Sequence, residues 1–379
     1  MILYSLLLIN SLLLGWILKA NHSVFAKKLY MLLMWGSMMF MAAIRAPSVG
    51  RDTAYFCRRF LRITAGGETR FEPGFVLLSR FLGVISSDPQ ILIIATSIII
   101  FGLFARFIYI NSQDVILSTF LFISMRFFFL YMNIMRQAIA IVIILLGFEY
   151  LKKNKNLRYC LAVFLASAFH YSALVALPLI LFKRIRYKKS FYAIAVIIAI
   201  VIYLNSAILF TFFVNFDERF SHYVGEAFER TTLIASQMYV FIYFLIITFA
   251  STVMYRVQIL TERASKYINN TRPTVRLLGL MQEEEFRKKS DFYIVCMFAC
   301  LYTAIIAVHA LIFHRIVEYF TIWLIVLIPQ TIMCIKDTTT KKVMYAVIIF
   351  VGIAHFYITL FFRPWWDGIL PYTTFFGIF

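Results

Sequence analysis

The feature that most constrains this chain is a series of long apolar runs separated by short polar or basic segments. Ten runs are long enough to cross a hydrocarbon core of roughly 30 Å as helices that rise about 1.5 Å per residue. With 62% apolar residues, 15% charged residues and a mean hydropathy of +0.84, the pattern predicts an all-α polytopic integral membrane protein. The ten runs cover residues 2–18, 29–44, 89–110, 115–131, 137–151, 190–213, 239–255, 291–313, 315–335 and 343–362.

Two further apolar segments do not fit a simple crossing. Residues 74–86 are too short and predict a re-entrant or interfacial helix. Residues 157–182 have basic flanks at both ends, so we expect two short helices that meet near His170, with that histidine toward the outer half of the membrane. The sequence thus predicts about 10–12 transmembrane helices in a single domain over residues 1–379.

The positions of lysine predict the orientation of the chain in the membrane. If the basic segments are cytoplasmic, as the positive-inside rule requires, all 15 lysines lie on the inner side. The largest inner loop is then 256–290, and both termini face outward together with 45–73, 214–238 and 363–379. The first run has no basic residue before it and no cleavage site after it, so we expect an uncleaved span.

The outer segments carry thirteen arginines and no lysine. Arginine has a planar fork of donors that matches phosphate and carboxylate groups. If residues 51–63 are helical, Arg51, Arg58 and Arg62 share a stripe roughly 40° wide, bordered by Tyr55. The stripe predicts an anion site, with lipid headgroups and a substrate diphosphate as its two candidate partners. The net charge of +19 is split into short clusters between apolar runs, so nucleic acid is not expected as a partner.

Six segments occur in a recognisable order from about residue 40 to the end of the chain. They are RAPSVGRDTAYF, RFEPGFVLLSRFLG, MRQAIAIVIILLGFEYLKK, LASAFHYSALVALPL, HRIVEYF and LPYTTFF. Together they resemble the EpsG-like family of Wzy-type polysaccharide polymerases. The resemblance implies a membrane glycosyltransferase with a GT-C-like architecture in the bacterial inner membrane. It would join undecaprenyl-diphosphate-linked oligosaccharide repeats on the outer face.

The resemblance also points to particular residues in these segments, namely Arg45, Arg51, Asp52, Glu72, Arg136, His170 and Arg315. The reaction needs stabilisation of the departing diphosphate, which arginines can supply, and deprotonation of an acceptor hydroxyl. Asp52, Glu72 and His170 are the candidate bases, although Asp52 also reads as a helix N-cap and His170 as a packed histidine. His222, in the variable loop 214–238, is a further candidate for the base or for substrate binding.

No Asp-x-Asp motif or other metal-binding pattern is found, so neither a metal nor another cofactor is expected. The expected partners are the lipid-linked donor and acceptor and membrane lipids, with a chain-length regulator protein as a further candidate. Two rivals belong to other classes. A flippase for lipid-linked sugars is disfavoured because charge within the spans is sparse, and an O-acyltransferase is disfavoured because His309 and His355 stand alone and read as packing residues. An O-antigen ligase, which uses a different acceptor, stays open. The terminal segment RPWWDGILPY predicts an aromatic interfacial anchor, with sugar stacking as the alternative.

Overall fold

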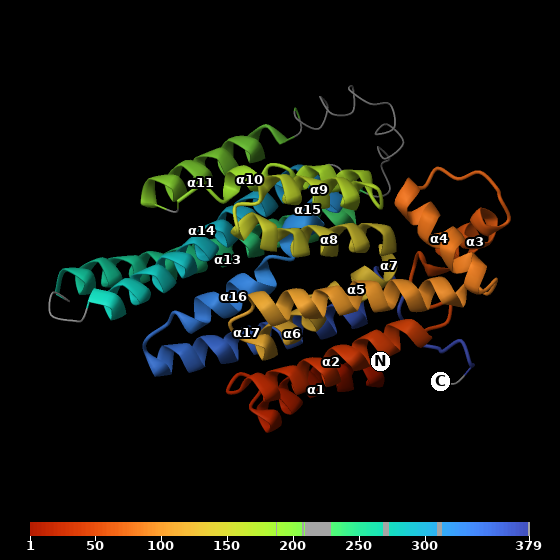
Figure 1. Ribbon diagram of the computed structural model, residues 1–379, viewed down its shortest axis with the longest axis horizontal. Helices are drawn as coiled ribbons and strands as arrows, with labels where there is room; N and C mark the ends of the chain where they lie inside the picture. Colours follow the sequence, from red (N-terminus) through yellow and green to blue (C-terminus); the bar gives the residue numbers. More distant parts are fainter. Residues whose placement is uncertain (187, 207, 209–228, 268–272, 309–312, 378–379) are drawn as a thin grey trace. The chain divides into compact units, whose positions relative to one another are not determined.

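The computed structural model describes residues 1–186, 188–206, 208, 229–267, 273–308 and 313–377 (Figure 1). Within these ranges the regular structure is helical, and the one β-bridge joins Arg45 to Thr374. The chain divides into two compact units, Met1–Ala176 with Thr338–Phe379 and Leu177–Asp337. The predicted class, an all-α polytopic membrane protein, is confirmed, whereas the single domain stays a prediction.

The first unit contains the N-terminal helices and the last long helix. These are α1 (Ile2–Leu18), α2 (Val24–Ile44), α3 (Thr53–Thr64), α4 (Pro73–Ile85), α5 (Gln90–Asn111), α6 (Val115–Ser124), α7 (Phe127–Asn133), α8 (Met135–Lys152), α9 (Asn156–Ser167), the 3₁₀ helix η1 (Tyr171–Ala176) and α17 (Thr338–Phe362). Local sequence explains several boundaries. The Ser23 hydroxyl caps α2 by accepting from Ala26 N at 3.0 Å, and the Asp114 carboxylate caps α6 by accepting from Leu117 N at 3.0 Å.

The second unit contains α10 (Leu179–Phe182), α11 (Lys189–Leu204), α13 (Glu229–Tyr267), α14 (Pro273–Ala307), α15 (His314–Thr321) and α16 (Leu324–Met333). The expected loop 256–290 is instead mostly helical, because α13 continues to Tyr267 and α14 begins at Pro273. This unit also contains a stacked pair, Tyr293 and Trp323, whose ring centroids are 5.6 Å apart.

By length and hydropathy, five helical stretches of the described chain qualify as membrane crossings. The number rises to six if the bent pair α6 and α7 is one span. The expected ten to twelve crossings would require shorter apolar helices, such as α1 and α11, to cross as well, so that number stays a prediction. The predicted short helix at 74–86 is confirmed as α4, which begins one residue earlier.

The predicted span 115–131 is wrong as a single straight helix. It breaks between α6 and α7 with a bend of 57°. Arg126 lies at the break with φ of +69°, a left-handed conformation that stops an α-helix. Its guanidinium forms a two-bond ion pair with the Asp367 carboxylate, with Nε–Oδ2 at 2.9 Å and Nη2–Oδ1 at 3.0 Å. A contact with a residue far along the chain thus accompanies a local break that hydropathy does not reveal.

The expected break in 157–182 is confirmed near His170. Helix α9 ends at Ser167 and η1 begins at Tyr171. The Tyr159 hydroxyl, near the start of α9, donates to Ala176 O at 2.7 Å, at the end of η1. Because these residues lie at opposite ends of the segment, the chain reverses direction around His170, as the hairpin predicts.

Hydrogen bonds show which helix ends of the first unit lie together. At one end Asn21 Nδ2 donates to Asp114 Oδ1 at 2.7 Å, and Lys152 Nζ donates to Asn111 Oδ1 at 3.0 Å. At the other end Gln90 Nε2 donates to Ala43 O at 2.8 Å. Lysines follow α1, begin α2 and end α8, so they gather at the first end. The predicted site residues of this unit gather at the second.

Candidate active site

Three residues from separate segments meet at the end of the first unit that lacks lysine. Glu72 immediately precedes α4, Arg136 is in the first turn of α8, and His170 lies in the reversal between α9 and η1. All three are among the predicted site residues, and each comes from a different one of the six segments. Arg136 and His170 lie 64 and 98 residues after Glu72 along the chain, so their contacts with Glu72 depend on the tertiary fold.

The Glu72 carboxylate connects the other two residues of the cluster. Its Oε1 lies 3.0 Å from His170 Nδ1 and accepts a longer hydrogen bond from Tyr171 N at 3.4 Å. Its Oε2 accepts a short hydrogen bond from Arg136 Nη1. The side chains of Glu72, His170 and Arg136 are 5%, 11% and 18% exposed, respectively. Because the carboxylate is almost completely buried, its charge is compensated by these neighbours and not by water.

Aromatic rings hold the arginine from another direction. The Arg136 guanidinium carbon lies 4.0 Å from the Phe71 ring centroid and 5.9 Å from that of Phe56. Phe71 also packs edge-on to Phe75, in the first turn of α4. The cation is thus fixed between a carboxylate and ring faces, a combination that restricts its orientation.

The local sequence around Glu72 fixes the position of its carboxylate. Pro73 occupies the first helical position of α4 and favours the extended backbone of Glu72 before it. Gly74 N donates to Ala168 O at 2.7 Å, and a Cβ on Gly74 would lie 2.7 Å from that same oxygen. Only glycine allows this approach of α4 to the end of α9, which brings Glu72 beside His170.

Burial raises the pKa of Glu72, but the hydrogen bond to His170 and the charge of Arg136 outweigh burial and hold that pKa below its usual range. The carboxylate is therefore ionised at neutral pH and is a poor proton acceptor. It is well suited to orient the His170 ring through Nδ1, which leaves Nε2 as the nitrogen able to take a proton.

Sequence reasoning missed a second set of contacts, centred on Asp367. Its side chain is 5% exposed and pairs with Arg126, whose guanidinium also lies 4.7 Å from the Trp366 ring centroid. The Asp367 carbonyl accepts from Arg51 N at 3.0 Å and from Asn133 Nδ2 at 2.9 Å. The one signal in the sequence is an acidic residue within the aromatic stretch RPWWDGILPY.

Asp367 and its neighbours hold the segment that carries Arg51 and Asp52. Gly50 N donates to Gly368 O at 2.8 Å, and Asp52 N donates to Asn133 Oδ1 at 3.3 Å. Asp52 occupies the N-cap position of α3, as expected, but its side chain makes no capping hydrogen bond. No described contact joins Asp52 to the Glu72 cluster.

Arg45 is used inside the helix bundle. It is 1% exposed, and its guanidinium donates to Ala42 O, to Ser97 Oγ at 3.1 Å and to Met132 O at 3.0 Å. In this structure its role is to join α2, α5 and the end of α7.

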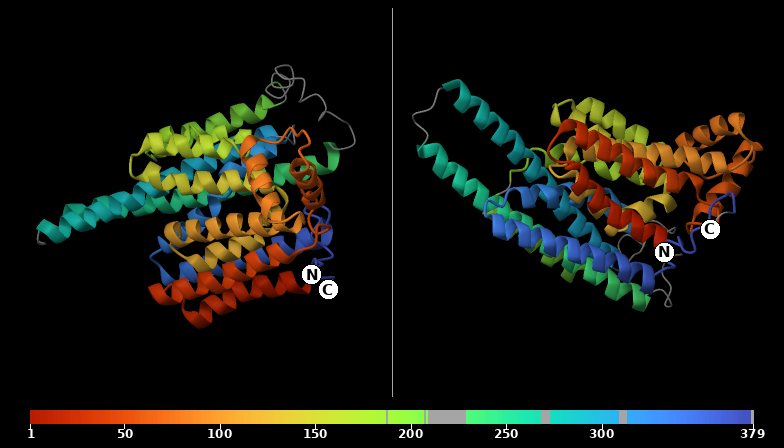
Figure 2. Two further views of the ribbon diagram at one scale, coloured as in Figure 1. Left: turned by 45° about the vertical axis from the view of Figure 1, so that its right-hand side comes forward. Right: turned by 90° about the horizontal axis from the view of Figure 1, so that it is seen from below.

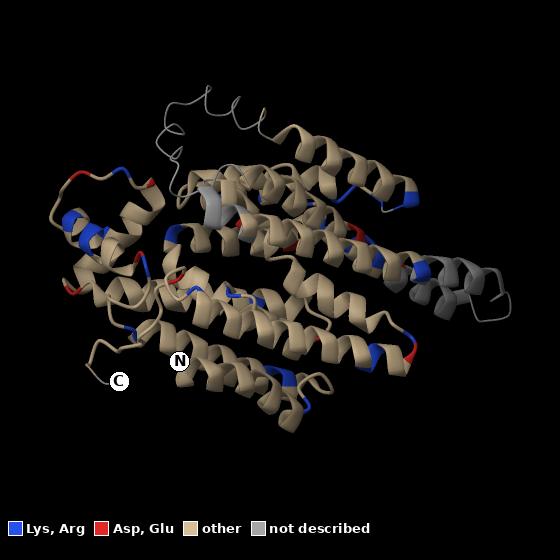
Figure 3. Cartoon of the chain, turned by 180° about the vertical axis from the view of Figure 1, so that it is seen from behind, with Lys and Arg blue, Asp and Glu red and all other residues tan. Residues whose placement is uncertain are grey.

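The remaining predicted arginines differ from the expected stripe. Helix α3 begins at Thr53, so Arg51 lies before it and cannot share a helical face with Arg58 and Arg62. Arg58 and Arg62 are four residues apart on α3 and exposed, like Tyr55, whose ring centroid lies 5.1 Å from the Arg59 guanidinium carbon. Figure 3 shows basic residues on this helix.

Two candidates lie elsewhere. Arg315 is exposed on α15, in the second unit. His222 lies outside the residues that the structure describes, as does His309. His355 lies on α17 with its Nδ1 2.8 Å from Ser124 O, a contact typical of a packed histidine.

The fold and site define a polytopic helical membrane protein with a buried Glu-Arg-His cluster at one end of the helices of its first unit. A family model described as the EpsG family matches residues 28–374, a range that includes every contact of the cluster. The chain therefore belongs to the EpsG family, and this membership indicates a polysaccharide polymerase type of function. Comparison with curated proteins and with solved structures gives no significant match.

Proposed function

We propose that this protein is a glycosyltransferase that polymerises undecaprenyl-diphosphate-linked oligosaccharide repeats on the outer face of the bacterial inner membrane. The observation that carries the proposal is the meeting of Glu72, Arg136 and His170. Family membership supports a polymerase. The separation of this cluster from the lysines of the same unit supports an outward-facing site with both termini outside.

In the proposed reaction the acceptor hydroxyl attacks the anomeric carbon of the donor sugar. The new C–O bond forms as the bond from that carbon to the diphosphate oxygen breaks, and the electron pair leaves with the diphosphate. The hydroxyl proton passes to His170 Nε2, while Glu72 holds Nδ1 and stabilises the resulting imidazolium.

Arginines provide the positive charge for the departing diphosphate in this proposal, without a metal ion. Arg136 is held beside His170 through the Glu72 carboxylate. Arg51 is exposed, and its backbone is fixed by the hydrogen bond of its N–H to Asp367 O. Both can form charge-assisted hydrogen bonds that strengthen as charge develops on the leaving oxygen.

His170→Gln tests the proposal in a strain that lacks the chromosomal gene. Glutamine keeps the approximate volume and a hydrogen-bonding group beside Glu72 but cannot accept the proton, so we expect about a 100-fold or greater loss of rate. Electrophoresis of the surface glycan should then show single repeats in place of long chains. His355→Gln is the matched control, because it changes a packed histidine of the same unit and should leave long chains.

Three outcomes would contradict the proposal. Normal chain length in His170→Gln, with wild-type protein levels, would return His170 to a structural role. Long chains that accumulate unattached in the deletion strain would indicate a ligase, and repeats confined to the inner side would indicate a flippase.

A further inference from the structure

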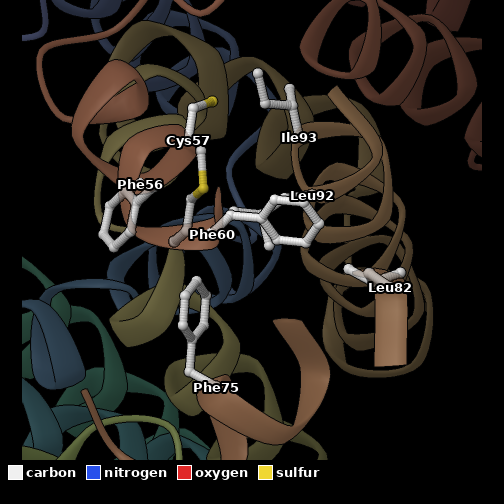
Figure 4. Packing of buried hydrophobic residues seen from close by; sticks show 8 residues of the cluster. Phe56, Cys57, Phe60, Phe75, Leu82, Leu92 and Ile93 are labelled. Carbon is white, nitrogen blue, oxygen red and sulfur yellow. The ribbon is translucent and has the colours of Figure 1, made fainter. Parts of the chain in front are cut away.

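The helices α3 and α4 form a pair with two different exposed faces. They lie beyond the ends of α2 and α5 and run across the direction of those helices (Figures 1 and 2). Their shared core contains Phe56, Cys57 and Phe60 from α3, with Phe75 and Leu82 from α4 (Figure 4). The faces turned away from this core are therefore available to another partner.

The exposed face of α4 is mostly apolar, with Arg80 exposed at its edge. Leu77 is 70% exposed, Phe81 62% and Val84 87%, at spacings of four and three residues that place them on one side of the helix. The buried residues Phe75, Ser79 and Leu82 occupy the other side. Since the side of α4 that faces α3 is already packed, the exposed apolar residues form a second, separate surface of the helix.

The exposed face of α3 is basic. It carries Arg58 and Arg62, while Phe56, Phe60 and Ile63 face the core. One hairpin therefore presents guanidinium groups mainly from α3 and large apolar side chains mainly from α4, although Arg80 on α4 and Leu61 on α3 are exposed as well. This pairing is typical of a helix at the boundary between phospholipid headgroups and acyl chains.

The connection to α5 limits how far the hairpin can lie from the membrane. Helix α5 is the most hydropathic of the candidate spans and begins at Gln90, whose side chain bonds to Ala43 O at the end of α2. Val84 precedes Gln90 by six residues, which reach at most roughly 20 Å when fully extended. The C-terminal end of α4 therefore lies close enough to the start of α5 to reach the membrane surface.

We propose that α3 and α4 dock onto the surface of the anionic phospholipid bilayer, with Leu77, Phe81 and Val84 in the acyl region and Arg58 and Arg62 on lipid phosphates. The occupant is the bilayer itself and not the lipid carrier of the sugar. Because Glu72 immediately precedes α4, the docked lipid also supports the position of its carboxylate. The docking does not depend on the proposed reaction, and it can be tested by fluorescence quenching without any measurement of activity.

The test uses the full chain in vesicles, with Cys160 and Cys334 changed to serine and an environment-sensitive fluorophore attached at Val84→Cys. The vesicles contain phosphatidylcholine with or without phosphatidylglycerol, and a lipid with a spin label high on its acyl chain is the quencher. We expect strong quenching at Val84. The same label at Glu68→Cys, in the exposed polar loop before α4, should stay unquenched.

Arg58→Gln and Arg62→Gln test the headgroup contacts. Each should lower the ratio of docked to undocked hairpin about fivefold in vesicles with phosphatidylglycerol and have little effect without it. A label at Phe350→Cys, 72% exposed on α17, should be quenched in every variant and reports that the chain remains inserted and folded.

Three results would overturn the inference. Equal access of aqueous iodide to the labels at Val84 and Glu68 would place α4 in water. Quenching that ignores both phosphatidylglycerol and the arginines would remove the phosphate contacts. Quenching that needs added undecaprenyl diphosphate would assign the surface to the carrier lipid.

Discussion

At the scale of single residues, the site depends on one carboxylate that contacts a histidine ring and a guanidinium cation. One oxygen of the ionised Glu72 carboxylate accepts a hydrogen bond from His170 Nδ1, and the other accepts one from the Arg136 guanidinium. A base whose partner is a buried carboxylate that is ionised at neutral pH is oriented before substrate arrives. The three candidate bases therefore differ: His170 is the proposed proton acceptor, Glu72 orients it, and Asp52 contacts neither of them in the described structure.

Glu72→Gln should destabilise the protein in a manner that depends on pH. At neutral pH we expect a loss of about 3 kcal/mol, because the buried charge beside Arg136 disappears. The pKa of Glu72 is lower in the folded state than its ordinary value of 4.5. The stabilisation is therefore complete above that value and is lost as pH falls through the lower folded pKa.

Thermal unfolding of purified wild type and Glu72→Gln in detergent, from neutral to acid pH, measures this difference. The two melting temperatures should converge at acid pH. A constant difference across the whole range would show that the glutamine acts through packing and not through charge.

At the scale of elements, sequence patterns predict local structure much better than they predict contacts. The short helix before residue 86 and the reversal at His170 follow from segment length and flanking charge, both of which are local. The ion pair between Arg126 and Asp367 joins residues 241 positions apart, and no periodicity or spacing connects them. The burial of Arg45 could not be predicted for the same reason, because the exposure of a side chain depends on which helices surround it.

The approach of α4 to α9 gives a prediction for this scale. Gly74→Ala places a Cβ against Ala168 O, where it would lie 2.7 Å away, so the start of α4 must move. We expect a cost of about 1–3 kcal/mol and shorter glycan chains, because Glu72 moves away from His170. Gly102→Ala is the matched control, since a Cβ at that helical glycine has no neighbouring atom within 4 Å.

The readouts are melting temperature and glycan length for both variants. If Gly74→Ala gave wild-type chains with a lowered melting temperature, the contact would serve stability alone. A similar loss from Gly102→Ala would show that the assay reports expression and not the site.

At the scale of the whole molecule, the distribution of lysine predicts which surfaces face the cell exterior. Glu68 lies in the loop before α4, whereas Glu285 lies on α14 within the predicted inner segment, and both are exposed. A membrane-impermeant maleimide should label Glu68→Cys in intact cells and Glu285→Cys only after the membrane is opened. Labelling of Glu285→Cys in intact cells would reverse the proposed orientation.

The return of the C-terminal segment to residues 44–51 has a consequence for how the protein is made. Ser48 and Thr373 are partners separated by 325 residues, which a ribosome needs roughly 20–60 s to add. During that time the carbonyl groups that accept hydrogen bonds from Gly50 N and Arg51 N, those of Gly368 and Asp367, have not yet been synthesised. The loop that presents Arg51 is therefore completed only after Gly368 has been added, and a chain that stops before Asp367 would lack the backbone that fixes it. Synthesis order thus restricts this part of the candidate site to chains that have been translated beyond Gly368.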